Sequence, residues 1–189
     1  MEHFTIPWRK TSRKIRAFVT VVGLSMALSA CNTADKTVLP PLPTVASVDV
    51  QRYLGSWVQQ ALVPNKFQKM CVRDTTATYA RDGDGLSVTN RCLDADGKPV
   101  EAKGVAKVLE GSNNAKLKVS FFRPFYGDYW VLALDPDYQW VLVGEPAREF
   151  GWVLSRAKTL DDATYNAIVD KAAALGYDKT KFVRSVNNP

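Results

Sequence analysis

The feature that most constrains the fold is a series of short apolar stretches separated by turn clusters. From Val48 onward, stretches rich in Val, Thr, Tyr, Phe and Trp recur at intervals of about 8 to 12 residues, as in all-β proteins. The intervening clusters, such as 81–85 and 94–99, contain the Gly, Asn and Asp that adopt the positive φ of tight hairpins. We expect eight strands, near residues 55–62, 72–80, 85–92, 100–109, 116–122, 127–134, 140–145 and 151–155.

One helix follows these strands. Apolar residues recur at helical spacing over 161–175, Thr159 is a candidate cap and Gly176 a stop signal, and a last strand is expected near 181–186. Closure removes the exposed edges of a sheet, and eight strands leave an interior that holds one small ligand. The prediction is therefore an all-β, eight-stranded antiparallel up-and-down β-barrel with one C-terminal α-helix packed outside. An outer-membrane barrel is disfavoured by four lysines in the strands: Lys103, Lys107, Lys116 and Lys118.

The first thirty residues have the pattern of a secretory signal. Five basic residues over 9–16 precede an apolar run over 17–28, which is too short to span a membrane. The run ends in Leu28-Ser29-Ala30-Cys31, which resembles the lipobox of bacterial lipoproteins, in which the cysteine receives diacylglycerol. Ordinary cleavage, leaving a free thiol, is the alternative.

These observations divide the chain into a signal peptide (1–30), a lipidated Cys31 with a proline-rich tether (31–47), and a barrel domain (48–189). Asn32 after the cysteine favours the bacterial outer membrane. We expect the protein to be attached to that membrane through the acyl anchor, with the barrel facing the periplasm.

Charge and histidine content restrict the function. Five of the 25 Lys and Arg and one of the 19 Asp and Glu precede Cys31, which leaves a net charge of +2 and no dense basic run, so nucleic-acid binding is not expected. The single histidine, His3, lies in the signal peptide. Histidine-dependent nucleophilic systems and histidine zinc sites are therefore excluded from the mature chain. We expect no enzyme activity, no metal and no cofactor.

Two cysteines remain beyond the anchor. An exported chain enters an oxidising compartment, and a turn centred near Asp82 places Cys71 and Cys92 almost opposite each other on neighbouring strands. We predict a disulfide between them, with two free thiols or a poor two-thiolate metal site as alternatives.

Three motifs occur in order at the expected strand positions. They are Gly55-Ser56-Trp57, Asp135-Pro136-Asp137-Tyr138 and Trp152-Val153-Leu154-Ser155-Arg156, over about 130 residues. This combination resembles the lipocalin family. The resemblance implies structural roles for Gly55, for Trp57 as a plug of the closed barrel end, and for Arg156 lying across it.

The same resemblance implies that Tyr79, Asn90, Phe121, Tyr129 and Trp152 line a ligand pocket. Strand alternation from Trp57 adds Gln59 and Ala61, and the same period adds further neighbours: Ala77, Val88, Val119, Val131, Trp140 and Leu142. A solid core made of these residues is the alternative. The expected ligand is a fatty acid or lysophospholipid, with its head group near Arg123, Arg148 or Lys66.

A second surface is indicated near the presumed open end. Phe122, Phe125, Tyr126 and Trp130 cluster around one loop and are candidates for a membrane-contact or homodimer patch. Two other functions remain open: a structural or stress-related envelope lipoprotein without a specific ligand, and a lipid-modifying enzyme on the same scaffold.

Overall fold

The computed structural model describes residues 39–188. The predicted signal peptide and the predicted lipidation site Cys31 lie outside these residues. Within this part, no helix is long and apolar enough to cross a membrane.

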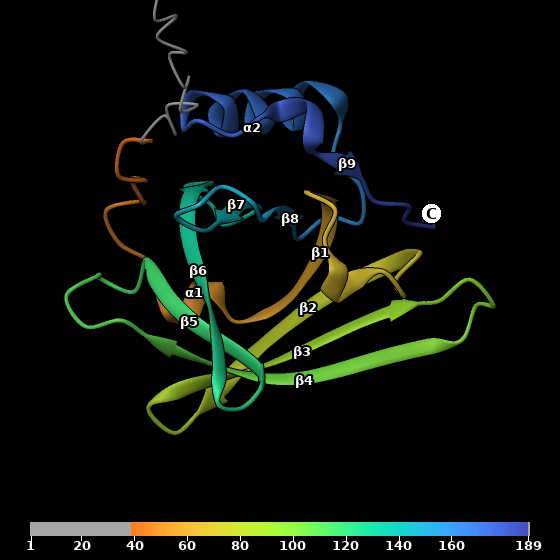
Figure 1. The fold of residues 1–189 in the computed structure, drawn as a ribbon, viewed down its shortest axis with the longest axis horizontal. Helices are drawn as coiled ribbons and strands as arrows, with labels where there is room; N and C mark the ends of the chain where they lie inside the picture. The colour runs from red at the N-terminus through yellow and green to blue at the C-terminus, as the bar shows by residue number, and fades with distance from the viewer. Residues whose placement is uncertain (1–38, 189) are drawn as a thin grey trace, which may run out of the picture. The chain divides into compact units, whose positions relative to one another are not determined.

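Eight antiparallel strands form a closed barrel (Figure 1). Neighbours along the chain pair in sequence, and the barrel closes where Val58 to Leu62 of the first strand pair with Trp152 to Ser155 of the eighth. The predicted fold class is confirmed. The strands are β1 (Gly55–Leu62), β2 (Arg73–Asp82), β3 (Gly85–Leu93), β4 (Pro99–Val108), β5 (Lys116–Phe122), β6 (Phe125–Leu134), β7 (Trp140–Gly144) and β8 (Gly151–Ser155).

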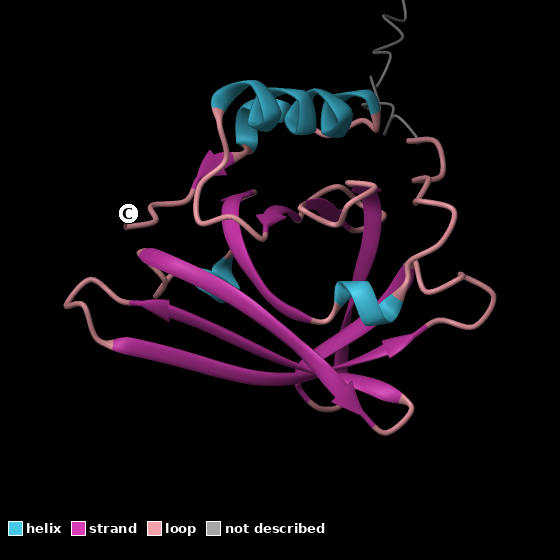
Figure 2. Ribbon diagram, turned by 180° about the vertical axis from the view of Figure 1, so that it is seen from behind, coloured by secondary structure: helices cyan, strands magenta, loops and turns pink. Residues whose placement is uncertain are grey.

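One end of the barrel is covered and the other is open to loops. The short helix α1 (Val50–Tyr53), capped by Asp49, precedes β1 at the covered end and lies in front in Figure 2. The turns at 82–85, 109–115 and 135–139 share this end, because the strands alternate in direction. The opposite end carries η1 (Lys66–Gln68) and the turns at 94–98, 123–124 and 145–150.

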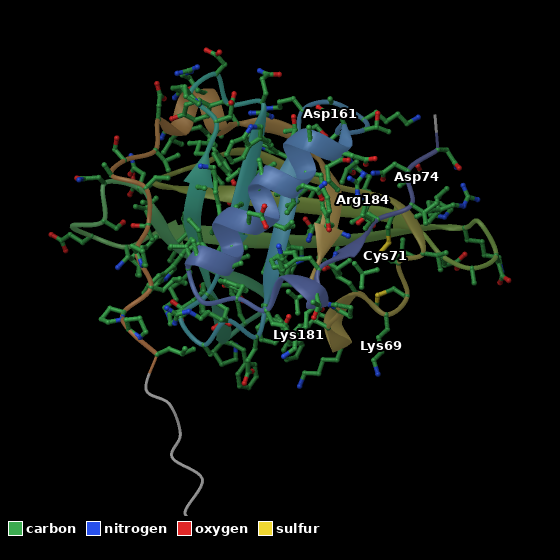
Figure 3. The ribbon with its side chains drawn as sticks, turned by 90° about the horizontal axis from the view of Figure 1, so that it is seen from above. Lys69, Cys71, Asp74, Asp161, Lys181 and Arg184 are labelled. Atoms are coloured by element: carbon green, nitrogen blue, oxygen red, sulfur yellow. A yellow bond between two sulfur atoms is a disulfide. The ribbon has the colours of Figure 1, made fainter. Side chains whose placement is uncertain are left out.

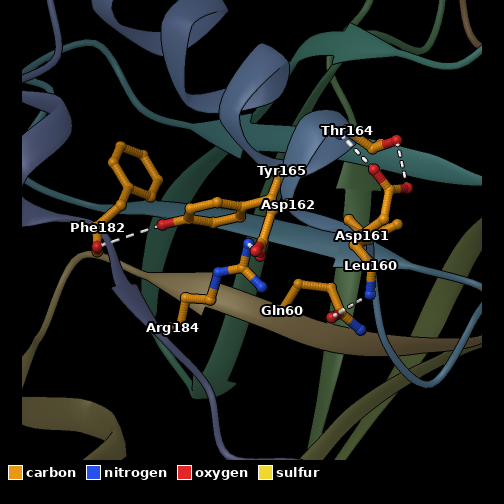
Figure 4. Close-up of polar contacts among 8 residues, drawn as sticks. All are labelled: Gln60, Leu160, Asp161, Asp162, Thr164, Tyr165, Phe182 and Arg184. Carbon is orange, nitrogen blue, oxygen red and sulfur yellow. Dashed lines mark hydrogen bonds and ion pairs between the residues drawn. The ribbon is translucent and has the colours of Figure 1, made fainter.

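The helix α2 (Asp162–Ala174) packs outside the barrel, as predicted (Figures 1 and 2). Its buried residues Ile168, Val169 and Ala172 share one apolar cluster with Leu142 of β7 and Val153 of β8. The cap is Asp161 rather than Thr159, because the Asp161 carboxylate accepts hydrogen bonds from the Thr164 N–H (2.9 Å) and hydroxyl (2.7 Å) (Figure 4).

The chain after α2 returns to the barrel through η2 (Lys179–Lys181) and β9 (Val183–Arg184), which pairs with Ala61 and Leu62 of β1. Arg184 donates to Asp162 (2.7 Å) and stacks 3.9 Å from the centre of the Tyr165 ring (Figure 4). The C-terminal residues thereby extend the sheet where β1 and β2 diverge, and Val186 bridges to Arg73.

Part of the predicted tether is not a tether in the structure. Leu42 is buried in the cluster beneath α2, and the N–H of Val45 donates to the Val131 carbonyl (3.0 Å). Arg148, in the loop between β7 and β8, donates to the Pro40 carbonyl (2.7 Å). Residues 39–47 therefore lie against the barrel, because a buried leucine and backbone hydrogen bonds hold a segment that looked merely extended.

The predicted disulfide between Cys71 and Cys92 is present, with a Cα separation of 5.5 Å (Figure 3). It ties the loop after β1 to the open end of β3.

Candidate functional site

The covered end is sealed by the predicted Trp57 and Arg156 pair. Trp57 is completely buried, and the Arg156 guanidinium lies 3.7 Å from the centre of its ring. Arg156 also donates to the carbonyls of Arg52 (2.8 Å), Leu54 (2.9 Å) and Ser56 (2.8 Å). Partial burial lowers the pKa of the Arg156 guanidinium, because burial disfavours its charged form. The hydrogen bonds to the carbonyl oxygens keep the guanidinium in place over the ring.

The third predicted structural residue, Gly55, has φ +92°, a region that favours glycine. A Cβ at this position would lie 3.5 Å from the Arg156 guanidinium. The guanidinium therefore packs closely against the backbone of Gly55. The covered end is therefore a packed plug rather than a binding site.

Above this plug, three tyrosines form a buried hydroxyl cluster. The Tyr129 hydroxyl lies 2.7 Å from that of Tyr53 and accepts from that of Tyr79 at 2.8 Å. Burial raises the pKa of Tyr79 to about 12, an effect that the hydrogen bond with Tyr129 partly offsets, and burial raises the pKa of Tyr53 and Tyr129 well above their usual value. At neutral pH these side chains are uncharged hydrogen-bonding groups on an otherwise apolar wall.

Most of the predicted lining residues do face the interior. They share the cluster of Trp57 or pack against it: Ala77, Tyr79, Val88, Val119, Tyr129, Val131 and Trp152. Gln59 opposes the inward Leu154, and Asn90 opposes Ala77, so both face the same side as these partners. Gly104 of β4 is paired with the inward-facing Val88, so a Cβ on Gly104 would point into the interior. That Cβ would lie 2.8 Å from the Phe121 ring. The Phe121 ring therefore covers the interior side of β4.

Three predicted lining residues face the wrong way. Ala61, Trp140 and Leu142 belong to the cluster between the sheet and α2. For Ala61 the cause is a β-bulge between Gln59 and Ala61, which shifts the alternation of β1 by one residue. In β7, Val143 pairs with the inward Val131 and Trp152, so Val141 and Val143 face inward and their neighbours outward.

Several interior residues were missed by the sequence interpretation: Leu86, Ala106, Leu117, Val141 and Val143. Alternation from Val88 and from Val119 would have found Leu86 and Leu117. For β7 no such signal exists, because both of its faces are covered and both are apolar.

Burial decreases from the covered end towards the open end. Near α1, a cavity of only about 10 Å³ remains among Val48, Tyr53, Leu86, Leu117 and their neighbours. Further up, the inward-facing Ala77, Asn90 and Trp152 are only half-buried, and Phe121 is 44% exposed. Solvent therefore reaches the upper part of the wall, which is mostly apolar.

A polar network crosses this upper part. The Trp152 indole donates to Gln68 (2.8 Å), Gln68 donates to Gln59 (3.0 Å), and Gln59 donates to the Ser185 hydroxyl (2.9 Å). The Asn90 side-chain oxygen is buried and has no hydrogen-bond partner among the described residues. The upper interior thus combines apolar surface with a few fixed donors and acceptors, as small-molecule sites do.

The three cations predicted to bind a head group differ in their availability. Lys66 and Arg123 are exposed at the open end. Arg148 instead donates to three backbone carbonyls, those of Leu175, Pro146 and Pro40, so its guanidinium serves to hold loops together. No group of three or more His, Cys, Asp or Glu within residues 39–188 is placed to hold a metal ion.

An antiparallel eight-stranded barrel, plugged at one end by stacked Trp and Arg and open at the other, places the protein in the class of small up-and-down barrel proteins. Residues 48–187 match the profile of the lipocalin-like domain, and the chain belongs to the lipocalin family.

The chain is similar to relatives from plants and bacteria. Temperature-induced lipocalin-1 of Arabidopsis thaliana is 40% identical over 149 residues, which cover 74% of this chain and 80% of the relative. The outer membrane lipoprotein Blc of Escherichia coli (strain K12) is 38% identical over 174 residues, which cover 90% and 96%. Insecticyanin from the tobacco hornworm Manduca sexta shares the fold, with a TM-score of 0.63 and 21% identity over 80% of this chain and 86% of that one.

Proposed function

We propose that this protein binds a lipid with one acyl chain, a fatty acid or a lysophospholipid, in the upper half of its barrel. The observation that carries the proposal is the gradient of burial along the interior wall: it is packed near α1 and half-exposed but apolar towards the open end. Burial of an acyl chain there would contribute roughly 0.8 kcal/mol per CH₂ group. Lys66 and Arg123, exposed at the open end, are suited to pair with a carboxylate or phosphate.

The same proposal includes a membrane anchor on Cys31 and a location at the outer membrane, with the barrel in the periplasm. It is supported by the Leu28 to Cys31 sequence and by the relatives named outer membrane lipoproteins. Labelling of cells with a tagged fatty acid should mark the wild-type protein and leave a Cys31→Ser variant unmarked. An unmarked wild-type protein would remove the anchor from the proposal.

The binding proposal is tested by displacement of a fluorescent fatty acid, with two tryptophan variants as a matched pair. Trp152 of β8 faces the upper interior, whereas Trp140 of the neighbouring strand β7 faces α2. The two variants therefore remove the same side chain from opposite faces of the sheet. Trp152→Ala should weaken binding at least several-fold, whereas Trp140→Ala should bind as the wild type does.

A third variant keeps the test decisive if Trp152→Ala folds poorly. Ala77 is small, inward-facing and half-buried, so Ala77→Trp should fill the space and block the probe while circular dichroism stays unchanged. Wild-type protein that fails to bind the probe at micromolar concentration would instead favour a structural envelope lipoprotein. Hydrolysis of the added lipid would favour an enzyme.

A further inference from the structure

Exposed large apolar side chains gather at the open end of the barrel. Among residues 39–188, nine large apolar side chains are exposed, and none lies on the turns of the covered end. Two of them, Val183 and Val186, belong to the C-terminal segment. The other seven form what we call the rim surface: Leu39, Phe67, Met70, Val72, Phe121, Phe122 and Phe125.

The two most exposed members project from the hairpin between β5 and β6. Phe122 is 75% exposed and Phe125 71%, and their rings stack with centres 6.2 Å apart. On the loop after β1, Phe67 is 64% exposed and Met70 50%. Exposed apolar groups of this size on several loops of one end mark a surface that contacts another apolar phase.

Cations accompany these side chains. Lys66 lies 5.3 Å from the centre of the Phe67 ring, Lys69 follows two residues later, and Arg123 sits between Phe122 and Phe125. Apolar side chains interspersed with Lys and Arg are typical of segments that lie in the interface of a phospholipid membrane, where anionic head groups attract the cations.

The start of the described chain lies at this same end. The Pro40 carbonyl is held by Arg148 of the loop between β7 and β8, and Figure 3 shows the first described residues at the end that carries the labelled Lys69, with α1 at the opposite end. Eight peptide units separate Leu39 from Cys31, a span of at most about 28 Å when fully extended. A lipid anchor on Cys31 would therefore hold the open end near the bilayer surface.

We propose that the rim surface docks on the phospholipid bilayer in which the chain is anchored, so that the open end of the barrel faces the membrane. The orientation rests on the proposed anchor, and its use for lipid uptake rests on the proposed binding function. A series of aromatic rings joins the rim surface to the upper interior. The ring centres of Phe67 and Phe150 are 5.9 Å apart, and the Phe150 ring stacks on that of the inward-facing Trp152 with centres 6.3 Å apart. A lipid that leaves the bilayer would meet aromatic surface from the rim surface to the interior.

The test uses the full, lipidated chain in vesicles of phosphatidylethanolamine and phosphatidylglycerol. An environment-sensitive fluorophore is attached at one of two engineered sites, Phe122→Cys in the rim surface or Asp84→Cys in the exposed turn of the covered end. The probe at 122 should emit at shorter wavelength and be quenched by lipids that carry a nitroxide near the head group. The probe at 84 should show neither effect.

Three outcomes would overturn the proposal. The first is a probe at 122 that stays in water, and the second is a probe at 84 that is quenched more strongly than the probe at 122. The third is a shift at 122 that grows with protein density and is insensitive to quencher lipids, which would show that a second copy of the chain covers the rim surface. In vesicles of phosphatidylcholine alone, the quenching of the probe at 122 should weaken, because Lys66, Lys69 and Arg123 then meet no anionic lipids.

A pair of variants separates this proposal from the binding function. The double variant Phe122→Ser and Phe125→Ser should lose the quenching of a probe at Phe67→Cys, an exposed site of the rim surface on the loop after β1, and keep the displacement of fluorescent fatty acid. Trp152→Ala should keep the quenching of the probe and weaken the binding of the fluorescent fatty acid. If the double variant retains the quenching, the docking proposal fails even where ligand binding is intact.

Discussion

Tyr129 is the residue on which the buried hydroxyl cluster depends. Among the described residues, the hydroxyls of Tyr53 and Tyr79 have Tyr129 as their hydrogen-bond partner. Tyr129→Phe leaves two buried hydroxyls unpartnered, at about 1–3 kcal/mol each, whereas Tyr79→Phe removes one hydrogen bond, worth about 0.5–1.5 kcal/mol. Urea unfolding should therefore show a larger loss of stability for Tyr129→Phe. Equal losses would mean that the hydroxyls find other partners.

The same cluster makes stability depend on alkaline pH. Burial raises the pKa of Tyr79 to about 12, against about 10 in an unfolded chain, so folding favours the neutral phenol. Its contribution is fully present below about pH 10 and is lost as the pH rises through about 12. The free energy of unfolding should fall in this window, and more gently in Tyr79→Phe.

Tyr177 lies outside the barrel, in the apolar cluster beneath α2, and burial there raises its pKa to about 12 as well. Its contribution to stability is therefore lost in the same pH window as that of Tyr79. Tyr177→Phe should therefore reduce the alkaline loss by a separate amount. An unfolding free energy that stays constant between about pH 10 and 12 would contradict both assignments.

At the scale of elements, the contact between α2 and the barrel depends on a glycine in β7. A Cβ on Gly144 would overlap the Tyr177 hydroxyl, which accepts from the Glu145 N–H (2.9 Å) and donates to a neighbouring carbonyl. Gly144→Ala should therefore displace Tyr177 and destabilise the protein by about 1–3 kcal/mol in urea unfolding.

Gly127 in β6 provides the matched control, because a Cβ there would meet no atom within 4 Å. Gly127→Ala should leave the unfolding midpoint nearly unchanged. If the two alanine variants unfold alike, the close approach of Tyr177 to β7 is not what positions this segment after α2.

The elements also show how far the sequence could predict the structure. The strand positions, the helix and the disulfide were predictable, because turn residues, helical spacing and cysteine placement are local signals. The plug of Trp57 and Arg156 followed from the family resemblance. Apart from the pairing of two strands that one tight turn connects, these features require no knowledge of which partner a strand meets.

The errors arose where a second layer covers the sheet. Trp140 and Leu142 were placed inside because β7 is apolar on both faces, one towards the interior and one towards α2, so its pattern does not reveal its facing. Ala61 was misplaced by a bulge that leaves no clear sequence signal. Residues 39–47 seemed a free tether because two scattered apolar residues, Leu42 and Val45, and hydrogen bonds to backbone groups leave no recognisable sequence pattern.

At the scale of the whole barrel, its two ends have different packing. The covered end combines α1, the Trp57 and Arg156 plug and the tyrosine cluster. The open end combines loops, one disulfide and half-buried apolar wall. Local stability follows buried contacts, so the open end should open more readily to exchange with solvent.

This difference predicts where a bound lipid should act. A ligand at a hundred times its dissociation constant stabilises the folded state by about 2.7 kcal/mol, provided that it binds only that state. Hydrogen exchange with added palmitate should therefore slow in the loops at 63–72 and 145–150, which border the upper interior, and stay unchanged in the turn at 135–139. The Ala77→Trp variant should show neither the stabilisation nor the slower exchange. Protection centred on 135–139 would place the ligand at the covered end, where the small cavity leaves no room for an acyl chain.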